Sequence, residues 1–439
     1  MANSGKTVIV IGGGVAGLAA ASLLSHREFI VTVIERNNRL GGRTFSIQDQ
    51  TTSEIIDNGQ HILMGCYHYT LRWLDFLGQA LQTPTQPAIR IPFAEPQKKL
   101  GSLTIPNLPM PFHLIAGIAQ FENISFKERL LLLWLGFALP FQTISETVSV
   151  DHWLSASGQT ENLKTYFWNP ICLAVMNTSL KTASAKVFTA AIKQIFLGSR
   201  NHSRLIVPTI TLSELFVFPS EAFIRSHNGV ILMNQGIDKI QIEGGQISGI
   251  LLRDGTFLKA DIYISAVPQS ALIKIIGNQT LSKYFRSMTF LEYSPIVSVY
   301  LWLENFRVDQ LFEGKIIGCI NTTIQWVFKK SDDLIEITIS GARDIVDWNR
   351  KKIFELVVSD LKSLFSNFDS SSVRHYQVIK ERHATFSQVP GSNCGRPSGI
   401  TAIKNFYLTG DWTDTGLPAT IESAVKSAYT VVDHICELK

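Results

Sequence analysis

Three glycines near the N-terminus have the spacing that brings a phosphate group close to a protein backbone. Gly12, Gly14 and Gly17 form a G-x-G-x-x-G pattern, and Glu35 follows eighteen positions after the last of them. The first glycine permits a tight turn, the second lets a pyrophosphate approach the chain, and the third lets a helix pack closely on a strand. A carboxylate at the position of Glu35 accepts hydrogen bonds from a ribose diol. The pattern predicts a dinucleotide site, and the alternative is a glycine-rich turn in an ordinary α/β protein.

The elements that must position these residues lie on both sides of the glycines. Residues 7–11 are a β-branched run typical of a buried parallel strand, and residues 18–24 are good helix formers. A second apolar strand is expected at 30–34, directly before Glu35. The N-terminus of the intervening helix offers unpaired N–H groups and a partial positive charge to phosphates. Strand, glycines, helix, strand and acid in this order favour dinucleotide binding.

The residues after Glu35 narrow the choice of dinucleotide. Paired glycines permit a second close backbone approach, and Arg43 can neutralise phosphate charge. The run E-R-x-x-R-L-G-G-R at 35–43 resembles the second signature of the flavin-containing amine oxidase and phytoene desaturase superfamily. The resemblance implies FAD as cofactor. It assigns to FAD binding Gly12, Gly14, Ala16, Gly17, Glu35, Arg36, Gly41, Gly42 and Arg43.

The composition of the chain limits the number of domains and the function classes to be considered. The chain has 439 residues, of which 45% are hydrophobic and only 17% charged, and its length predicts two to three domain-sized units. A net charge of +4 is too small to indicate nucleic-acid binding. The first strand begins too early to leave room for a signal peptide. The five cysteines are widely spaced without a C-x-x-C, so neither zinc nor any other metal site is expected and a reducing cytoplasm is the default.

A polar segment follows at 54–61, where apolar residues lead into Asp-Asn-Gly-Gln-His. This predicts a strand that ends in a tight turn. In the superfamily this segment passes close to the flavin ring, which makes Asp57 and His61 polar candidates at the redox centre and places Gly59 and Gln60 beside the cofactor. The alternative is a turn whose polar residues have only local capping roles.

The composition of the chain changes between residues 81 and 139. Residues 81–111 are rich in proline, which predicts edge strands or loops and the crossing into a second domain. Residues 130–139 are apolar around the whole helix circumference but too few to span a bilayer. This helix is either buried inside the domain or dips into a membrane surface. A short helix at 212–218, stopped by Pro219, is expected to bring the chain back to the first domain.

Strands are expected at 230–233, 237–242, 247–252 and 261–266, with hairpin turns at 244–245 and 254–255. In the superfamily a three-stranded meander returns the chain to the FAD domain here, and the position of Ile237 contacts adenine through its backbone. Further strands at 295–303, 334–340 and 375–380 and a long helix at 344–365 belong most naturally to the second domain.

The last informative segment is a strand at 405–409, then Gly410 and Asp411, then a loop that leads into a helix at 423–436. Gly410 allows close approach of a ligand, and Asp411 is placed to bind a ribityl hydroxyl. Pro418, Ala419 and Thr420, at the start of the helix, complete the FAD site from the other end of the chain.

We therefore predict an α/β chain in two parts. A discontinuous Rossmann-like FAD-binding domain is formed by residues 1–80, 212–290 and 395–439. A mixed α+β substrate-binding domain is formed by residues 81–211 and 291–394.

Four motifs together make the resemblance more specific: D-N-G-Q-H at 57–61, F-W-N-P at 167–170, N-T at 177–178, and G-D-W-T-D-T-G-L-P-A-T-I-E-S-A-V at 410–425. They resemble the bacterial squalene-associated FAD-dependent desaturases, now understood as hydroxysqualene dehydroxylases. The resemblance implies reductive removal of the allylic hydroxyl of hydroxysqualene to give squalene, a step toward hopanoids. It also implies prenyl synthases as possible partners and contact with the inner face of a membrane, because the substrate is a long apolar isoprenoid. The electron donor stays open.

Removal of an allylic hydroxyl needs an acid to help water leave. Asp57, His61, Asp414 and Glu422 are the candidates, and no spacing decides among them, although Glu422 has the alternative role of a helix cap. We favour Asp414, which lies in the 410–425 loop. The flanks of Cys394 do not suit covalent attachment, so FAD is expected to bind non-covalently. An amine oxidase, a carotenoid desaturase and a non-enzymatic FAD-binding escort remain alternatives, although residues 130–197 carry few charged groups for holding an amine.

Overall fold

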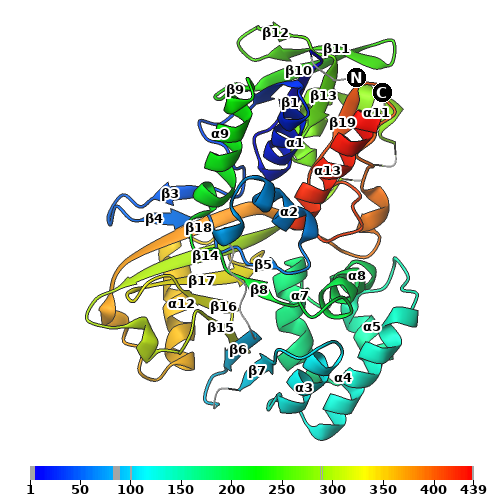
Figure 1. Ribbon diagram of the computed structural model, residues 1–439. Coiled ribbons are helices and arrows are strands. Elements are labelled where there is room, and N and C mark those ends of the chain that lie inside the picture. The colour runs from blue at the N-terminus through cyan, green and yellow to red at the C-terminus, as the bar shows by residue number, and fades with distance from the viewer. Residues whose placement is uncertain (1–4, 83–88, 99–100, 287, 289, 438–439) are drawn as a thin grey trace.

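The computed structural model describes residues 5–82, 89–98, 101–286, 288 and 290–437. Figure 1 shows an upper half that holds both termini and a lower half in which a sheet and a group of helices lie side by side. Chain segments cross between the halves several times, so each half is built from pieces that are distant in sequence.

A five-stranded parallel sheet forms the core of the upper half, in the order β19-β13-β1-β2-β9. Its strands are β1 (Thr7–Ile11), β2 (Ile30–Ile34), β9 (Val230–Leu232), β13 (Ile262–Ser265) and β19 (Phe406–Leu408). Helices α1 (Val15–His26) and α13 (Ile421–Glu437) pack against each other along the sheet. The predicted α/β class is confirmed, because β-branched strands buried on both faces need helices to cover them.

The meander above this sheet differs in one respect from the prediction. It consists of β10 (Ile237–Glu243), β11 (Gln246–Leu252) and β12 (Phe257–Leu258) in antiparallel order. The strands expected at 230–233 and 261–266 exist, but they join the parallel sheet as β9 and β13. The short β12 was not predicted, because two residues give no alternation to detect.

A seven-stranded sheet dominates the lower half, in the order β18-β14-β17-β16-β15-β6-β7. Its strands are β6 (Ile89–Ala94), β7 (Ser102–Ile105), β14 (Tyr293–Leu303), β15 (Ile316–Cys319), β16 (Trp326–Lys329), β17 (Leu334–Ser340) and β18 (Val373–Phe386). Helix α12 (Arg350–Leu364) covers one face (Figure 1). It begins later than the predicted 344 because Asn349 caps it by accepting from Lys352 N.

A helical layer lies beside this sheet. It contains α3 (Phe112–Gln120), α4 (Phe126–Ala138), α5 (Val150–Ala156), α6 (Glu161–Leu163), the π-helix η3 (Lys164–Trp168), α7 (Asn169–Met176) and α8 (Ala185–Phe196). One hydrophobic core joins these helices to β6 and β7. Of the proline-rich stretch 81–111, residues 83–88 and 99–100 lie outside the described residues.

The helix predicted to stop at Pro219 does not stop there. A π-helical turn, η4 (Ser213–Val217), continues directly into α9 (Phe218–Ser226), with Pro219 in the first turn of α9. Proline is tolerated at that place because its missing N–H would be unpaired in any case. The π-turn absorbs the change of hydrogen-bond pattern, so the prediction was wrong about the end of the helix.

The remaining elements are short and lie between the strands and helices given above. They are β3 (Ser46–Gln48), β4 (Ile55–Asp57), β5 (Leu63–Met64), α2 (His68–Phe76), η1 (Ala80–Gln82), η2 (Leu139–Phe141), β8 (Leu205–Ile206), α10 (Gln269–Ile276), α11 (Asn278–Tyr284), η5 (Val308–Gln310), η6 (Ser370–Ser372) and η7 (Ser392–Gly395).

The strands of the upper sheet and meander come from segments 1–80, 212–290 and 395–439, and those of the seven-stranded sheet from 81–211 and 291–394. The division into an FAD-binding and a substrate-binding domain stays a prediction. Within the described part of the chain, no helix is both long enough and apolar enough to cross a membrane.

Candidate functional site

The three glycines form a cradle at the carboxyl end of β1. Gly12 has φ +102°, a conformation that side chains rarely adopt. A Cβ on Gly17 would lie 1.9 Å from Gly12 O, so α1 reaches its close packing only with glycine there. A Cβ on Gly14 would meet only Gly42 Cα, at 3.9 Å, which leaves open space in front of Gly14. No described side chain caps α1 at Gly14, so the first N–H groups of this helix, which include that of Ala16, are free for an anion.

The second glycine pair lies directly against the first run. Gly41 N donates to Gly13 O at 2.8 Å, and a Cβ on Gly42 would lie 3.1 Å from Gly14 Cα. Two backbone segments without side chains therefore face each other. This arrangement fits a pyrophosphate held by main-chain groups.

Glu35 lies at the end of β2 and is buried. Its Oε2 accepts from Gly13 N at 2.9 Å, and its Oε1 accepts from Asn37 N and Nδ2 at 2.9 and 2.7 Å. A carboxylate accepts about four hydrogen bonds, so one site is left on Oε2 for a ribose hydroxyl. Arg36, the next residue, is exposed at the edge of the cradle.

The start of β10 runs alongside Glu35. Asn234 N donates to Asn37 O, and Gln235 N donates to Glu35 O, both at 2.9 Å. Ile237 follows and packs in the same core as Ile34. The structure thus brings Ile237 to the ribose end of the cradle, where the resemblance implies adenine.

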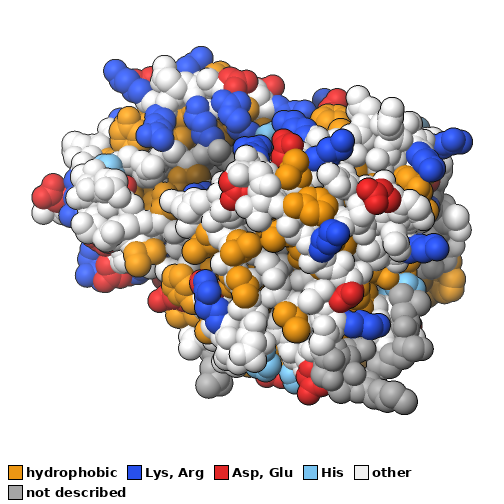
Figure 2. All heavy atoms as spheres, turned by 90° about the horizontal axis from the view of Figure 1, so that it is seen from above, with side chains coloured by type: hydrophobic (Ala, Val, Ile, Leu, Met, Phe, Trp, Pro, Cys, Tyr) orange, Lys and Arg blue, Asp and Glu red, His pale blue; other side chains and the backbone are white. Residues whose placement is uncertain are grey.

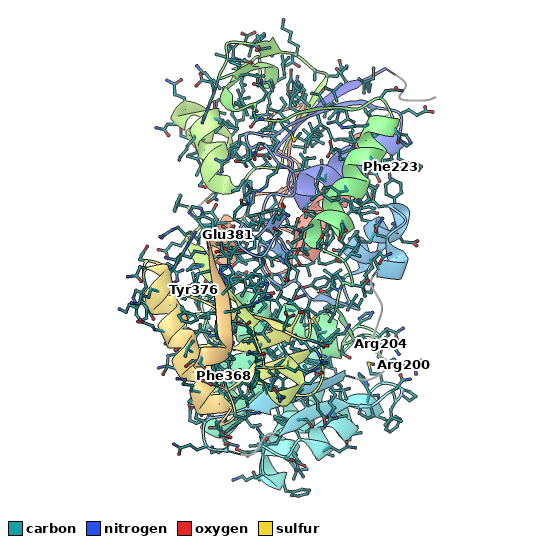
Figure 3. The ribbon with its side chains drawn as sticks, turned by 90° about the vertical axis from the view of Figure 1, so that its left-hand side faces the viewer. Arg200, Arg204, Phe223, Phe368, Tyr376 and Glu381 are labelled. Carbon is teal, nitrogen blue, oxygen red and sulfur yellow. The ribbon has the colours of Figure 1, made fainter. Side chains whose placement is uncertain are left out.

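Arg43 and Asp411 meet from opposite ends of the sequence. Arg43 Nη2 lies 2.7 Å from Asp411 Oδ1, and its Nη1 donates to Ala384 O at 2.6 Å. Asn58 Nδ2 donates to Arg43 O and to Glu381 Oε2, and Glu381 is labelled in Figure 3 where the two halves meet. An ion pair at this junction places both groups within reach of one ligand.

A small recess opens beside this ion pair. It is lined by Arg43, Pro268, Gln269, Leu291, Tyr293, His383, Phe386, Asp411 and Trp412.

The loop between Asp411 and α13 is held by a residue that sequence reasoning missed. Buried Arg396 donates to the carbonyl oxygens of Asp411, Thr413 and Leu417. Burial lowers the pKa of Arg396 to about 10. A buried cation that donates to three carbonyl oxygens of one loop has a positioning role, and its place between Gly395 and Pro397 gave no sequence signal.

The rest of this loop leads into α13. Gly410 N donates to Ser427 Oγ at 2.8 Å, Ala419 N donates to Gln388 Oε1 at 3.2 Å, and Thr420 Oγ1 accepts from Ser423 N at 3.2 Å. Pro418 and Ala419 are buried at the start of α13.

Asp57 ends β4 and is buried. Its Oδ1 accepts from Ser46 Oγ at 2.8 Å and from Leu212 N at 2.9 Å, and its Oδ2 lies 3.7 Å from Lys330 Nζ. These contacts join β3, β4 and the start of η4, so the Asp57 side chain has a structural task whatever else it does.

His61 lies two residues beyond Gly59. Its Nδ1 is 2.9 Å from Gly59 O, and burial lowers the pKa of the imidazole. Because a carbonyl only accepts, Nδ1 carries the proton, and Nε2 of the neutral ring is an acceptor. His61 is therefore better placed to receive a proton than to deliver one.

The structure adds a residue to this cluster that sequence reasoning missed. Glu336 on β17 is 0% exposed, and its Oε1 accepts from Gln60 N at 2.6 Å. Its Oε2 has no hydrogen-bond partner among the described residues. Burial raises the pKa of this carboxyl group, which favours the protonated form. The available signal was a single acid within the otherwise apolar or hydroxylated run 334–340.

Sheet register explains why Glu336 points toward the D-N-G-Q-H turn. Glu336 pairs with Tyr300 of β14, and paired residues project to the same face. Tyr300 Oη donates to Asp57 O at 3.0 Å, and a Cβ on Gly59 would lie 2.9 Å from Ser298 Oγ. Neighbouring Ile335 and Ile337 project to the other face, toward α12.

The remaining candidate acids are placed differently. Asp414 is exposed, and its Oδ1 accepts from Gly416 N at 3.3 Å, so it is not enclosed in an apolar cavity. Glu422 is buried, but its carboxylate accepts from Tyr69 N, Thr70 N and Thr70 Oγ1 at 2.7–3.0 Å. Glu422 therefore caps α2 rather than its own helix.

All five cysteines are free thiols, and Cys394 is exposed on η7. Among the described residues, no group of three or more His, Cys, Asp or Glu side chains is arranged to hold a metal ion.

The comparisons with known proteins agree with this geometry. A family profile described as flavin containing amine oxidoreductase matches residues 15–436. The chain is 26% identical to a hydroxysqualene dehydroxylase from Rhodopseudomonas palustris and 25% identical to one from Sinorhizobium fredii, with 98% of each chain covered in both cases. It is also 23% identical to a 15-cis-phytoene desaturase from Synechococcus elongatus, over 98% of this chain and 95% of the relative.

Solved structures confirm the fold. An oxidoreductase from Methanosarcina mazei superposes with a TM-score of 0.75 at 17% identity, covering 97% of this chain and all of that one. A cyclohexylamine oxidase from Brevibacterium oxydans superposes with a TM-score of 0.70 at 15% identity, covering 98% and 99% of the two chains.

Proposed function

Because the chain belongs to the flavin-containing amine oxidoreductase family, we propose that it uses non-covalently bound FAD to replace the allylic hydroxyl of hydroxysqualene with hydrogen, which yields squalene. The observation that carries the proposal is the match to hydroxysqualene dehydroxylases over 98% of both chains. At the coarser level the chain is a flavin-dependent oxidoreductase whose relatives act on lipophilic isoprenoids.

FAD as the cofactor is supported by the two ends of the site. The glycine cradle and the free acceptor site on Glu35 suit the adenosine diphosphate half. Asp411 and Arg43, which meet at the junction of the two halves, suit the ribityl chain and its phosphate. Purified protein should be yellow and should release intact FAD on denaturation, whereas flavin that stays with the precipitate would contradict non-covalent binding.

The reaction exchanges a hydroxyl for a hydride. Reduced flavin, when held by the glycine cradle, Glu35 and Arg43, would supply the hydride and would thereby be oxidised, while the hydroxyl would leave as water once it has received a proton. The protein must provide this proton and keep bulk water away. We propose Asp57, His61, Asp414 and now Glu336 as candidates for the group that holds the proton, and we favour Glu336.

Three features support Glu336. Its burial favours the protonated form, one carboxyl oxygen has no hydrogen-bond partner in the described part of the chain, and the other accepts from the backbone N–H of Gln60. The neutral His61 offers an acceptor atom beside the same turn. A carboxylic acid kept neutral at physiological pH by apolar surroundings is a known solution for general acids.

A carotenoid desaturase is the second candidate, because phytoene desaturases match over nearly the same length. The two reactions run in opposite redox directions, so they separate cleanly. Reduced protein should convert hydroxysqualene to squalene under anaerobic conditions, with flavin reoxidation matching product formation. Desaturation of phytoene by the oxidised protein, without any dehydroxylation, would assign the second function instead.

A further inference from the structure

Two buried oxygen atoms without hydrogen-bond partners belong to the same face of strand β17. Neither Glu336 Oε2 nor Thr338 Oγ1 is hydrogen-bonded to any of the described residues. Residues two apart on a strand project to one face, so both side chains point away from Ile337 and Ile339, which pack toward α12. The proposed reaction uses Glu336 as an acid but gives Thr338 no task. Since buried polar atoms are normally hydrogen-bonded, two such atoms on one face indicate a place for a ligand.

Thr338 is one member of a line of residues that crosses five strands. It pairs with Ser298 on β14 and with Trp326 on β16. Trp326 pairs with Gly318 on β15, and Gly318 pairs with Phe93 on β6. Paired residues of neighbouring strands project to the same face of a sheet. These five residues, called the Thr338 row, therefore form one line across the face that carries Glu336.

The Thr338 row is polar at one end and aromatic at the other. Ser298 and Thr338 carry hydroxyl groups, whereas the rings of Trp326 and Phe93 lie with their centroids 6.5 Å apart. Gly318 makes this ring contact possible, because a Cβ there would lie 2.6 Å from the Phe93 ring and 3.1 Å from the Trp326 ring. The missing side chain of Gly318 thus has a packing reason.

The aromatic end of the row continues into the helical layer, which lies beside β6 and β7 in Figure 1. The Phe93 ring is 6.1 Å from that of Phe121, which is 6.4 Å from that of Phe167. Phe167 opens the F-W-N-P motif at 167–170, to which the proposed reaction gives no role. A succession of rings without charged groups suits a hydrocarbon chain.

The polar end of the row lies beside the turn that carries Gly59 and Gln60. A Cβ on Gly59 would lie 2.9 Å from Ser298 Oγ, and Gln60 N donates to Glu336 Oε1. A protonated Glu336 donates its proton to the oxygen of a hydroxyl group, so the hydrogen of that hydroxyl needs an acceptor of its own. Thr338 Oγ1 is an acceptor on the same face, and no residue in the described part of the chain donates to it.

We propose that Thr338 binds the hydroxyl group of the substrate beside Glu336, while the aromatic end of the Thr338 row binds the adjoining hydrocarbon chain. Thr338 then selects a long apolar molecule with one hydroxyl group over one without it. An unoxygenated isoprenoid would leave the oxygens of Thr338 and Glu336 without partners, which is unfavourable in a buried site. The assignment rests on the proposed dehydroxylation and names the residue that recognises the leaving group.

The test measures equilibrium binding of radiolabelled hydroxysqualene and squalene to immobilised, oxidised holoprotein in one detergent. The oxidised flavin prevents turnover of the bound ligand. Thr338→Val keeps the shape of the side chain and removes its hydroxyl, so the preference for hydroxysqualene over squalene should fall by about tenfold. Thr338→Ser restores a hydroxyl and should keep the preference of the parent.

A second readout separates binding of the hydroxyl from delivery of the proton. In stopped-flow reoxidation of the reduced protein, Thr338→Val should raise the half-saturating concentration of hydroxysqualene by about tenfold. Its maximal rate should stay within about threefold of the parent, because the proton comes from another residue. Glu336→Gln, in contrast, should lower the maximal rate.

Two further variants serve as controls. Trp326→Leu shortens the aromatic end of the row, so it should weaken binding of both ligands equally and leave their ratio unchanged. Thr256→Val removes an exposed hydroxyl from the turn between β11 and β12 and should behave like the parent. That turn lies at the end of the molecule seen from above in Figure 2, where basic, acidic and apolar side chains are mixed. Flavin content and thermal unfolding should stay unchanged in all variants.

Three results would contradict the proposals in different ways. The same binding ratio in the parent and in Thr338→Val would overturn the assignment of Thr338. Squalene bound by the parent as tightly as hydroxysqualene would overturn recognition of the hydroxyl group altogether. A preference that Thr338→Val loses, in a protein that forms no squalene when reduced, would support the assignment and contradict only the proposed reaction.

Discussion

The glycine cradle and the cluster around Glu336 serve the same proposed reaction but are built in different ways. The cradle takes nearly all its groups from residues 12–43, and its geometry depends on the absence of side chains. The Glu336 cluster takes single residues from the turn after β4, from β14 and from β17. A contiguous segment with fixed spacing is readable in sequence, whereas a cluster assembled by sheet register is not.

The two regions also use burial differently. In the cradle, the buried Glu35 carboxylate accepts from Gly13 N and from Asn37, which lie in the same segment of the chain. In the cluster, the carboxyl group of Glu336 is buried and one of its oxygens has no hydrogen-bond partner among the described residues, which is costly unless the group is protonated. Flavin binding should therefore be sensitive to side chains that add volume in the cradle. The reaction rate should instead be sensitive to substitutions that change the proton affinity of the Glu336 cluster.

The largest effect is expected from Gly14→Val. The backbone of Gly14 is extended, with φ −77° and ψ 178°, and open space lies in front of it, so the variant should fold. The new side chain fills the space for the pyrophosphate, and flavin affinity should fall by about 100-fold or more. Flavin absorbance after purification and titration with FAD measure this. Gly17→Val, by contrast, should fail to fold, because its Cβ would clash with Gly12 O. If Gly14→Val retained flavin, the cradle would not be the cofactor site.

The next largest effect is expected on the rate at which hydroxysqualene reoxidises the reduced protein. Glu336→Gln should keep its flavin but slow reoxidation of the reduced protein by hydroxysqualene by about 10²–10⁴-fold, as for a lost general acid. Stopped-flow absorbance measures the rate in this variant and in Asp57→Asn, His61→Gln and Asp414→Asn. Glu355→Gln, on exposed α12, is the matched control. A parent-like rate in Glu336→Gln with a slow Asp414→Asn would restore the preference drawn from sequence alone.

A smaller effect, on flavin affinity, is expected at the Arg43–Asp411 ion pair, which joins residues from opposite ends of the sequence. Asp411→Asn removes the charge that faces Arg43 at 2.7 Å. Flavin should bind about 10–100-fold more weakly, the range of one hydrogen bond to a charged group, while the flavin that remains bound should react at the parent rate. Fluorescence titration with FAD gives the affinity. A changed rate at unchanged affinity would move Asp411 from the cofactor site to the reaction.

The smallest effect is expected in the pH dependence of the free energy of unfolding. The pKa of Glu336 is raised above its ordinary value of 4.5, so the folded state binds the proton more tightly than the unfolded state. The contribution of Glu336 protonation to the free energy of unfolding is therefore fully present below pH 4.5. It is lost as the pH rises through the folded-state pKa, by up to about 1.4 kcal/mol per pH unit. Glu336→Gln removes the dependence. Urea unfolding of both proteins between pH 4.5 and 8 should therefore show the variant gaining stability relative to the parent, and parallel curves would contradict a buried protonated carboxyl.

Helices and strands with clear periodicity were predicted well. β1, β2 and β19 lie within one residue of their predicted bounds, because each buries one continuous apolar surface. β15 and β16 were missed because both are short. β15 contains Gly318, and β16 ends in the charged Lys329. The end predicted at Pro219 was wrong because a π-turn lets the proline enter the first turn of α9.

The sequence by itself determined the cofactor cradle, since turns, glycines and helix starts act over a few residues and keep their spacing in the chain. It also determined that residues 130–139 are apolar around the whole helix circumference. Only the tertiary structure decided which side of α4 is buried, and that Glu422 caps α2, Arg396 holds the C-terminal loop and Glu336 lies behind Gln60. Each of these depends on partners 15 to 353 positions away, and no local pattern encodes which residues a folded chain brings into contact.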